Sequence, residues 1–300
     1  MLYSTRCTGC LLDDFVGALE RLELPEPKRL QLTQAALAFL AAHLADQVPP
    51  SYLITELHRI IKRELGLEEP FSELRALCNE VGLRLYEELS HTLAALPADE
   101  AFFEAVRWAV AGNVLDFRTA GAGYGMDLAR VRSELDEAVE SLDFDQRREL
   151  LKLARPGLAV LYVHDNVGEV ALDRLLIDQL RLRGARVASV LRGGPITSDA
   201  TWRDGETVGL AESSDEVLLA GPDTLGISLV EGTPSLLKAL AESDLIISKG
   251  QANYYVLSEP DTPVRGDLAF LFRTKCELAA RRYGLKGKYR NIVALQSASS

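Results

Sequence analysis

The chain has 300 residues, of which 47% are hydrophobic, so it can bury one large core or two modest ones. Its formal net charge of −11 argues against a nucleic-acid-binding surface, which would be basic. No apolar stretch is long enough to cross a bilayer, and the first residues lack the pattern of a signal peptide. We therefore expect a soluble, cytoplasmic protein with no nucleic-acid or membrane partner.

Four cysteines are too few for a disulfide framework in a chain of this length. Cys7 and Cys10 form a CxxC pair, while Cys78 and Cys276 stand alone. A structural zinc site would need a second close pair of Cys or His, and the four histidines are not spaced to supply one. We expect the CxxC pair to be structural or incidental, with a redox or metal-binding role as the alternative.

Residues 1–150 are predicted to be helical. Five segments carry apolar residues at intervals of three and four, as a helix with one buried face requires. Proline or glycine separates each segment from the next. The segments are 11–24, 28–46, 51–65, 71–96 and 99–115, and one or two further helices are expected within 127–157.

From residue 157 onward, short runs rich in Val, Ile and Leu alternate with helical segments. This alternation is typical of βαβ units and a parallel sheet. We predict strands within 158–163, 185–191, 216–221, 244–250 and 291–296, and helices within 170–184, 235–243 and 267–284. The predicted fold class is α/β, a three-layer α/β/α arrangement with a mainly parallel sheet. It combines a helical N-terminal subdomain, residues 1–150, with an α/β domain, residues 151–300.

The stretch 158–174 organises the predicted site. Its apolar run 159–163 reads as a buried strand, Asp165 and Asn166 follow at the carboxyl end, and a helix begins after Gly168. Ligands of open α/β sheets bind at the carboxyl ends of strands. Carboxylate and carboxamide oxygens are hard ligands that suit Mg²⁺ or Mn²⁺. The structural alternative is an Asx turn in which Asp165 caps the helix.

Three more polar clusters lie at turns beside predicted elements. One closes a helix at 112–116, one follows a strand at 198–201, and one follows a strand at 249–253. The clusters that follow strands are expected to converge on one edge of the sheet. Helix caps and ordinary strand exits are the alternatives for each cluster taken alone.

Together the clusters supply the side chains for a divalent cation and an anionic substrate. Asp165, Asn166 and Asp199 offer oxygen ligands for a metal, and Lys249 offers a point charge for a phosphate. Motifs of other ligand classes are absent: there is no P-loop, no dinucleotide fingerprint after a strand and no nucleophile elbow. A methyltransferase would also need a glycine-rich cofactor loop after the first strand, which this chain lacks.

Four motifs, GNVLDF, DNVGE, SDAT and KGQANY, occur in this order and resemble the damage-control phosphatase family, formerly domain of unknown function 89. The N-terminal CTGC and the segment EEPFSELRALCNE resemble its archaeal and bacterial branch. The resemblance covers nearly the whole chain. It implies an α/β/α fold with a helical N-terminal subdomain. It also implies metal-dependent hydrolysis of small phosphorylated metabolites, often with Mn²⁺, Co²⁺, Ni²⁺ or Mg²⁺.

The resemblance also implies roles for individual residues. The implied metal ligands are Asp165, Asn166 and Asp199. The expected catalytic residues are Asp165, Asp199 and Lys249, and either aspartate can be the base. The expected substrate-binding residues are Asn113, Asp116, Glu169, Lys249 and Asn253.

The fourth motif differs from the usual family pattern, KGQGN-aromatic-Glu. This chain has Ala252 in place of the second glycine and Tyr255 in place of the glutamate. The difference concerns the substrate side and leaves the implied metal ligands untouched. We expect a metal-dependent phosphatase acting on phosphate esters of small metabolites, such as sugar phosphates. The alternative is a non-catalytic protein that binds a metal or a phosphometabolite.

If the CxxC pair is incidental, replacing Cys7 and Cys10 with serine should leave phosphatase activity and bound metal unchanged. Metal content by elemental analysis and the rate of phosphate release check this. Zinc bound in equal ratio to the wild-type protein, and lost in the double variant, would show a metal role for the pair.

Overall fold

A seven-stranded sheet forms the centre of the computed structural model, which describes residues 2–119, 123–125 and 127–298. The strand order is β3-β9-β8-β7-β4-β5-β6. Strands β8, β7, β4, β5 and β6 run parallel, whereas β9 is antiparallel to β8 and β3 follows the direction of β9. Strands β1 and β2 form a separate antiparallel pair. The predicted α/β class with a mainly parallel sheet is confirmed.

The strands are β1 Arg118–Thr119, β2 Gly123–Tyr124, β3 Phe144–Asp145, β4 Ala159–Val163, β5 Arg186–Leu191, β6 Glu216–Leu219, β7 Leu245–Lys249, β8 Asp267–Arg273 and β9 Asn291–Gln296. The helices of the first half are α1 Cys7–Arg21, α2 Glu26–His43, α3 Pro50–Leu65, α4 Ser72–Ala94, α5 Ala98–Ala111, α6 Leu128–Glu140 and α7 Arg147–Leu153, with a short 3₁₀ helix η1 at Gly112–Leu115. The helices of the second half are α8 Glu169–Leu182, α9 Trp202–Thr207, α10 Leu210–Ser213, α11 Pro234–Glu242, α12 Gly250–Leu257 and α13 Glu277–Arg281. None of the helices in the described ranges is both long enough and apolar enough to cross a membrane.

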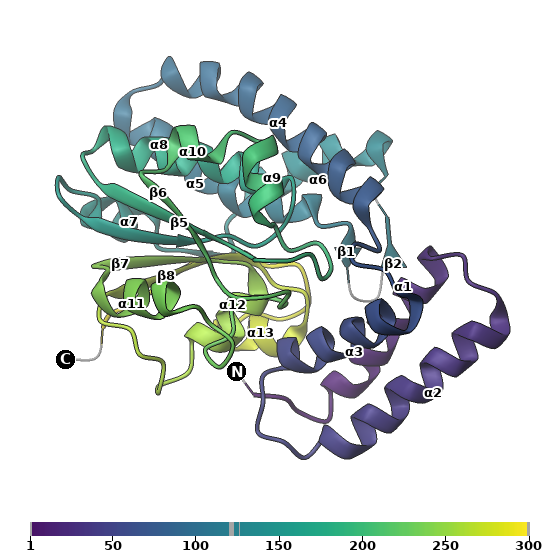
Figure 1. Cartoon of the computed structure of the whole chain (residues 1–300). Coiled ribbons are helices and arrows are strands. Elements are labelled where there is room, and N and C mark those ends of the chain that lie inside the picture. The colour runs from purple at the N-terminus through teal and green to yellow at the C-terminus, as the bar shows by residue number, and fades with distance from the viewer. Residues whose placement is uncertain (1, 120–122, 126, 299–300) are drawn as a thin grey trace.

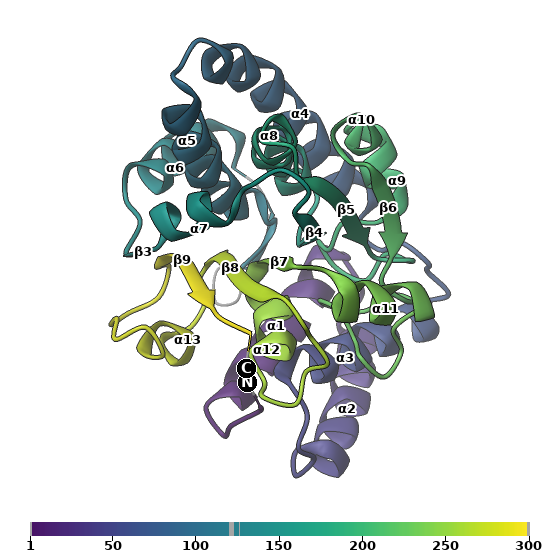
Figure 2. The same cartoon turned by 90° about the vertical axis from the view of Figure 1, so that its left-hand side faces the viewer.

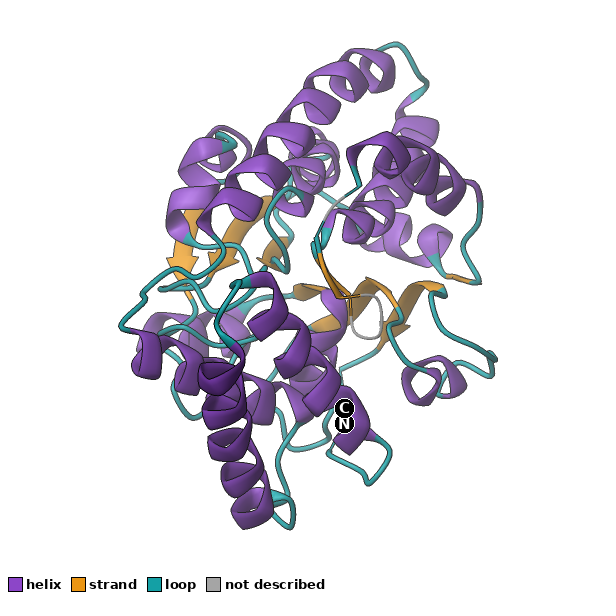
Figure 3. Cartoon of the chain, turned by 90° about the vertical axis from the view of Figure 1, so that its right-hand side faces the viewer, coloured by secondary structure: helices purple, strands orange, loops and turns teal. Residues whose placement is uncertain are grey.

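Helices cover both faces of the sheet, as Figure 1 and Figure 3 show. One face carries α4 to α8 and α10, and the opposite face carries α11, α12 and α13. Figure 2 views the same layers from the side, with the sheet between the two groups of helices. Successive residues of a strand point to opposite faces, so the buried apolar runs of the central strands feed both layers.

The predicted strands within 158–163, 185–191, 216–221, 244–250 and 291–296 are all confirmed, but the prediction of a helix across 267–284 is wrong at its start. Residues 267–273 form strand β8, and only Glu277–Arg281 is helical. The run 268–272 is buried throughout, with alternate residues in the cores on the two sheet faces. A continuous apolar run of this kind has no alternation in sequence, so periodicity cannot separate it from a buried helix.

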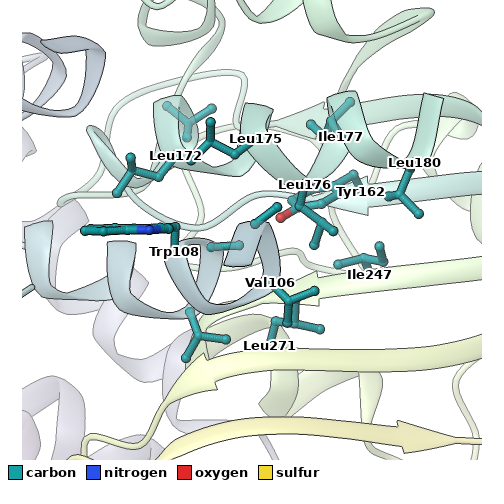
Figure 4. Close-up of a cluster of buried hydrophobic side chains, with 14 of the residues drawn as sticks. Val106, Trp108, Tyr162, Leu172, Leu175, Leu176, Ile177, Leu180, Ile247 and Leu271 are labelled. Atoms are coloured by element: carbon teal, nitrogen blue, oxygen red, sulfur yellow. The ribbon is translucent and has the colours of Figure 1, made fainter. Parts of the chain in front are cut away.

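The larger core lies between the sheet and the helices above it, and Figure 4 shows its centre. Trp108 of α5 lies beside Leu172 of α8, whereas Val106 of α5 lies beside Leu271 of β8. Tyr162, Ile247 and Leu271 enter the same cluster from three adjacent strands. Because α5 precedes residue 150 and α8 follows it, the helical part of the chain contributes a layer of the sandwich.

The first three helices form a cluster of their own. Leu11, Phe15, Leu32 and Leu57 lie in its centre, together with buried residues from the turns of the sandwich. One of these turn residues is Val167, just beyond the carboxyl end of β4. Helices α1 to α3 therefore pack beside the same sheet edge at which the polar clusters lie (Figure 1).

Helix α4 contacts the turn between β4 and α8 very closely. A Cβ atom at Gly82 would lie 2.2 Å from the carbonyl oxygen of Gly168, and Asn79 Oδ1 accepts a hydrogen bond from Gly168 N at 2.9 Å. Gly168 itself has a φ of +71°, a backbone conformation that favours glycine. These contacts fix the turn that carries the DNVGE motif.

Gly82→Ala should therefore destabilise the protein by about 1–3 kcal/mol, because the added methyl group has no room against the neighbouring backbone. Urea unfolding measures the change. Gly9→Ala is the matched control, since Gly9 is an exposed residue of α1 with open space around it. That substitution should be neutral or stabilising by up to about 1 kcal/mol. Equal effects at the two positions would contradict the packing described here.

Candidate functional site

The turns after β4 and β5 are joined to each other by backbone hydrogen bonds. Ala200 N donates to Asp165 O at 2.8 Å, and Val167 N donates to Ser198 O at 2.8 Å. Asn166 and Asp199 face each other as an isolated antiparallel bridge. Two of the predicted polar clusters are thus held against each other at the carboxyl edge of the sheet.

The start of α12, directly after β7, reaches the same place through Gly250. This residue has a φ of +75°, and a Cβ atom there would lie 1.9 Å from Asp165 Oδ2. Any side chain at position 250 would therefore occupy the space of the Asp165 carboxylate. The glycine of the KGQ segment is explained by this close approach.

Two carboxamides and two carboxylates meet around Asp165. Asn166 Nδ2 donates to Asp165 Oδ2 at 2.7 Å and to Glu169 Oε2 at 2.8 Å. Asn113 Nδ2 donates to the same two oxygens at 3.2 and 2.9 Å. Asn113 comes from the 3₁₀ helix that ends the α5 segment, so the first and second predicted clusters are also brought together.

The electrostatic environment of Asp165 is unfavourable to its charge. Burial raises the pKa of Asp165 well above its usual range, and the negative charges of Glu169 and Asp199 raise it further. Lys275 acts in the opposite direction. The buried carboxylates around Asp165 repel one another because too few cations lie beside them. A bound divalent cation would relieve this repulsion.

Lys249 lies between two carboxylates of α8. Its Nζ is 2.5 Å from Glu169 Oε1 and 2.6 Å from Asp173 Oδ1, and all three side chains are 0% exposed. Burial would lower the pKa of Lys249, but Asp173 and Glu169 raise it by more, so the ammonium stays charged. The lysine that the sequence predicts to contact a phosphate is thus paired with two carboxylates of α8.

Asp173 is the centre of a second set of contacts. Its Oδ2 lies 2.7 Å from His164 Nδ1, and its Oδ1 accepts a hydrogen bond from Tyr162 OH at 2.9 Å. Burial would raise the pKa of Asp173, but Lys249 and His164 lower it by more, so its net pKa lies below the usual range. The residue is therefore ionised and holds Lys249 in place.

Arg192 fixes the orientation of Asp199. Arg192 Nε donates to Asp199 Oδ2 at 2.9 Å, and the same oxygen accepts a hydrogen bond from Gly226 N at 2.7 Å. Arg192 Nη2 also donates to Asn253 Oδ1 at 3.0 Å. Asn253 Nδ2 in turn donates to Lys249 O at 2.7 Å, so the predicted residue Asn253 links the turns after β5 and β7.

Asp116 lies at the start of the segment that leads from η1 into β1. Its Oδ2 forms an ion pair with Lys275 Nζ, and its Oδ1 accepts a hydrogen bond from Arg118 N at 2.9 Å. Burial would lower the pKa of Lys275, but the negative charges of Asp116 and Asp165 together raise it by more, so its net pKa lies above the usual value. The Lys275 side chain is 17% exposed, in contrast to Lys249.

The available oxygen atoms fit a hard divalent cation. Asp199 Oδ1 and Asn113 Oδ1 are buried and have no hydrogen-bond partner among the described residues. Asn166 Oδ1 accepts one hydrogen bond, from Ser198 Oγ at 2.8 Å, and an amide oxygen can accept two. In the described part of the chain, no group of three His, Cys, Asp or Glu side chains is placed to hold a metal. A metal here would thus need a carboxamide ligand beside the aspartates.

Among the residues of this network that were not predicted from the sequence are Asp173, Arg192 and Lys275. Asp173 lies four residues after Glu169, and this spacing on a helix signals a shared face. Arg192 follows the last residue of β5 directly. Lys275 follows β8, so the incorrect helix prediction at 267–273 concealed its position at the sheet edge.

Comparisons with known proteins agree with this architecture. The profile of the damage-control phosphatase ARMT1-like domain matches residues 3–290. A damage-control phosphatase of Archaeoglobus fulgidus is 30% identical over 287 residues, which cover 95% of this chain and 96% of that protein. A damage-control phosphatase of Pyrococcus horikoshii is 30% identical over 281 residues, 92% of each chain. The crystal structure of a DUF89 family protein from Pyrococcus horikoshii matches with a TM-score of 0.81 at 27% identity, covering 98% of this chain and 99% of that one.

Replacing Lys249 with methionine should destabilise the protein by about 3–5 kcal/mol, because it leaves two buried carboxylates without their cation. Chemical denaturation measures the loss, with Lys238→Met, at an exposed position of α11, as the matched control. Adding Glu169→Gln to Lys249→Met should recover part of the stability by removing one stranded charge. A Lys249→Met protein as stable as the wild type would show that Lys249 does not offset the charges of Glu169 and Asp173.

Proposed function

The chain belongs to the damage-control phosphatase ARMT1-like family, and from this premise we propose that it is a metal-dependent phosphatase acting on phosphate esters of small metabolites, sugar phosphates among them. One observation carries the proposal. Asp199 Oδ1 is buried without a hydrogen-bond partner in the described structure, beside the Asp165 and Asn166 turn. A buried carboxylate oxygen left without a donor is costly, and a cation is the partner that would compensate it.

In this proposal Asp165, Asn166 and Asp199 hold the divalent cation, which is Mn²⁺, Co²⁺, Ni²⁺ or Mg²⁺. When bound, the cation supplies Lewis-acid stabilisation of a phosphoryl oxygen and lowers the pKa of a water molecule. Arg192 keeps one oxygen of Asp199 occupied, so the other oxygen is left for the metal. Ser198 orients the carboxamide of Asn166 in the same way.

The residues around Asp165 divide the remaining tasks. Asn113 and Asn166 donate hydrogen bonds to the carboxylates of Asp165 and Glu169 and thereby fix their positions. Either aspartate ligand can also take the proton of the attacking water. The substrate lies on the side of Asn113 and Asp116, where the site is lined by the 3₁₀ helix and the segment after it.

The phosphate contact of Lys249 stays a prediction. Two of the three N–H groups of its ammonium already meet Glu169 and Asp173, so one remains for a substrate oxygen. Asn253 is bound to Arg192 and to the backbone of Lys249. It therefore acts in this proposal by positioning the turn after β7.

A metal survey with a generic phosphate ester tests the proposal. Wild-type protein freed of metal should release phosphate after addition of one or more of the four cations and remain inactive with a chelator. Phosphate bound without any hydrolysis, across all four metals and a panel of sugar phosphates, would favour the non-catalytic binding protein instead.

Asp165→Ala should abolish both divalent-metal binding and hydrolysis, because it removes a proposed ligand of the metal. The fold should be kept, because the lost carboxylate is one whose charge burial and the neighbouring carboxylates disfavour. Asp199→Asn should weaken both more mildly, since an oxygen ligand stays and one charge is lost. Titration calorimetry measures metal affinity, with Asp136→Ala, at an exposed position of α6, as the control. Wild-type metal affinity in Asp165→Ala would exclude this residue as a ligand.

A further inference from the structure

The segment EEPFSELRALCNE, residues 68–80, has no part in the function proposed above. It covers the turn before α4 and the first turns of that helix. Arg75 and Asn79 lie four residues apart in it, so their side chains project from one face of α4. Their exposed fractions are only 2% and 3%. A guanidinium buried to this extent needs partners inside the protein, and these partners lie in the turns that carry the proposed metal ligands.

Arg75 bonds the turn that follows β5. Its Nη1 donates to Thr197 O at 2.8 Å and to Asp199 O at 3.0 Å. The carbonyl oxygens of Ser198 and Ala200 accept hydrogen bonds from backbone N–H groups of other segments. Four successive carbonyl groups are thus bonded, and alternate ones depend on the Arg75 side chain. Buried backbone of this kind keeps its conformation while its polar groups have partners.

The centre of this turn carries one proposed metal ligand and orients another. Asp199 is a ligand in the proposal, and its Oδ1 has no hydrogen-bond partner in the described structure. Ser198 Oγ donates to Asn166 Oδ1 at 2.8 Å and so fixes the second ligand. Arg75 bonds the carbonyl groups on both sides of Ser198. One guanidinium therefore holds both the backbone of Asp199 and the hydroxyl group that orients Asn166.

The Arg75 side chain is itself fixed by two carboxylates. Its Nη2 forms an ion pair with Asp204 Oδ2, and its Nε lies 3.0 Å from Glu69 Oε1. Asp204 Oδ2 also accepts a hydrogen bond from Thr201 N at 2.7 Å, and Asp204 Oδ1 accepts one from Asn79 Nδ2 at 2.8 Å. The orientation of the guanidinium is thus set by α4 and α9, which lie side by side (Figure 1).

We propose that Arg75 is a positioning residue for the metal, which holds the turn of Ser198 and Asp199 in the conformation that binds the cation; this assignment rests on the phosphatase function proposed above. Arg75 contacts neither the metal nor the substrate and acts through the backbone of the turn. A planar guanidinium suits this task, because its N–H groups point in fixed directions and meet two carbonyl groups and a carboxylate at once.

Titration calorimetry with Mn²⁺ tests the assignment in Arg75→Lys. Lysine keeps a positive charge beside Asp204, but its ammonium cannot reproduce the forked contacts to the turn. The affinity for Mn²⁺ should fall about 10- to 100-fold, the range for loss of a residue that orients metal ligands. Saturating Mn²⁺ should restore part of kcat with a phosphate ester, because no reacting group has been removed.

Two control variants separate positioning from stability. Glu69→Gln removes a carboxylate from the same guanidinium without touching the turn, so its Mn²⁺ affinity should equal that of the wild type. Leu93→Ala leaves a cavity near the end of α4 and lowers the stability measured by urea unfolding. Its folded form should bind Mn²⁺ as the wild type does.

A double variant covers the case in which Arg75→Lys does not fold. Arg75→Met combined with Asp204→Asn removes both members of the buried ion pair, so neither is left as an unpaired charge. This protein should show the same loss of Mn²⁺ affinity as Arg75→Lys. Failure of both Arg75 variants to fold would make the residue a part of the fold alone and overturn the assignment.

Wild-type Mn²⁺ affinity in Arg75→Lys would also overturn it, as would an equal loss of affinity in Leu93→Ala. A wild type that binds no Mn²⁺ contradicts both the role of Arg75 and the proposed function. A wild type that binds Mn²⁺ but releases no phosphate from esters contradicts the phosphatase function alone, and the calorimetric comparison still decides the role of Arg75.

Discussion

Crowding of buried carboxylates is the constraint on which this sheet edge depends. Asp165, Glu169, Asp173 and Asp199 are all buried within two neighbouring turns and the start of one helix. Like charges in a poorly solvated place repel each other strongly, so each must be paired, protonated or bound to a cation. Lys249 pairs with Glu169 and Asp173. The rest of the edge keeps an excess of negative charge over positive charge.

This uneven pairing of charges divides the site into two halves. One half is structural, and the other can accept a ligand. In the structural half, buried cations and carboxylates are matched, as with Arg192 and Asp199 Oδ2. In the other half, Asp199 Oδ1 and Asn113 Oδ1 have no donor in the described structure. The matched half keeps the oxygens of the other half in fixed positions before any ligand arrives, and such preorganisation is what a metal site needs.

Much of this architecture could be predicted from the sequence. The buried runs within 159–163 and 245–249 have the composition and length of parallel strands, and the four motifs that follow strands or helices identified the family correctly. The strand at 267–273 was missed because a strand buried on both faces loses the alternation by which strands are recognised. Because this strand was missed, Lys275, which follows it, was not predicted to lie at the sheet edge.

The partners of the buried charged side chains were harder to predict than the places of these side chains in the fold. The sequence placed Lys249 at the sheet edge correctly, but its partners depend on the angle at which α8 leaves the turn. The turn before α8 packs against α4 through Gly168, a contact between residues far apart in the chain. Asp173 was detectable in principle from its helical spacing to Glu169, whereas Arg192 has no comparable signal in a single sequence.

The contacts around Asp165 join residues that are far apart in the chain, and this has a consequence for biosynthesis. The contact between Asn113 and Asp165 spans 52 residues, and that between Asp116 and Lys275 spans 159. Because a domain generally folds as a unit, the site around Asp165 cannot be complete before the segment that carries Lys275 has been synthesised. The carboxylates of this sheet edge are therefore synthesised before Lys249 and Lys275, the two lysines that pair with them.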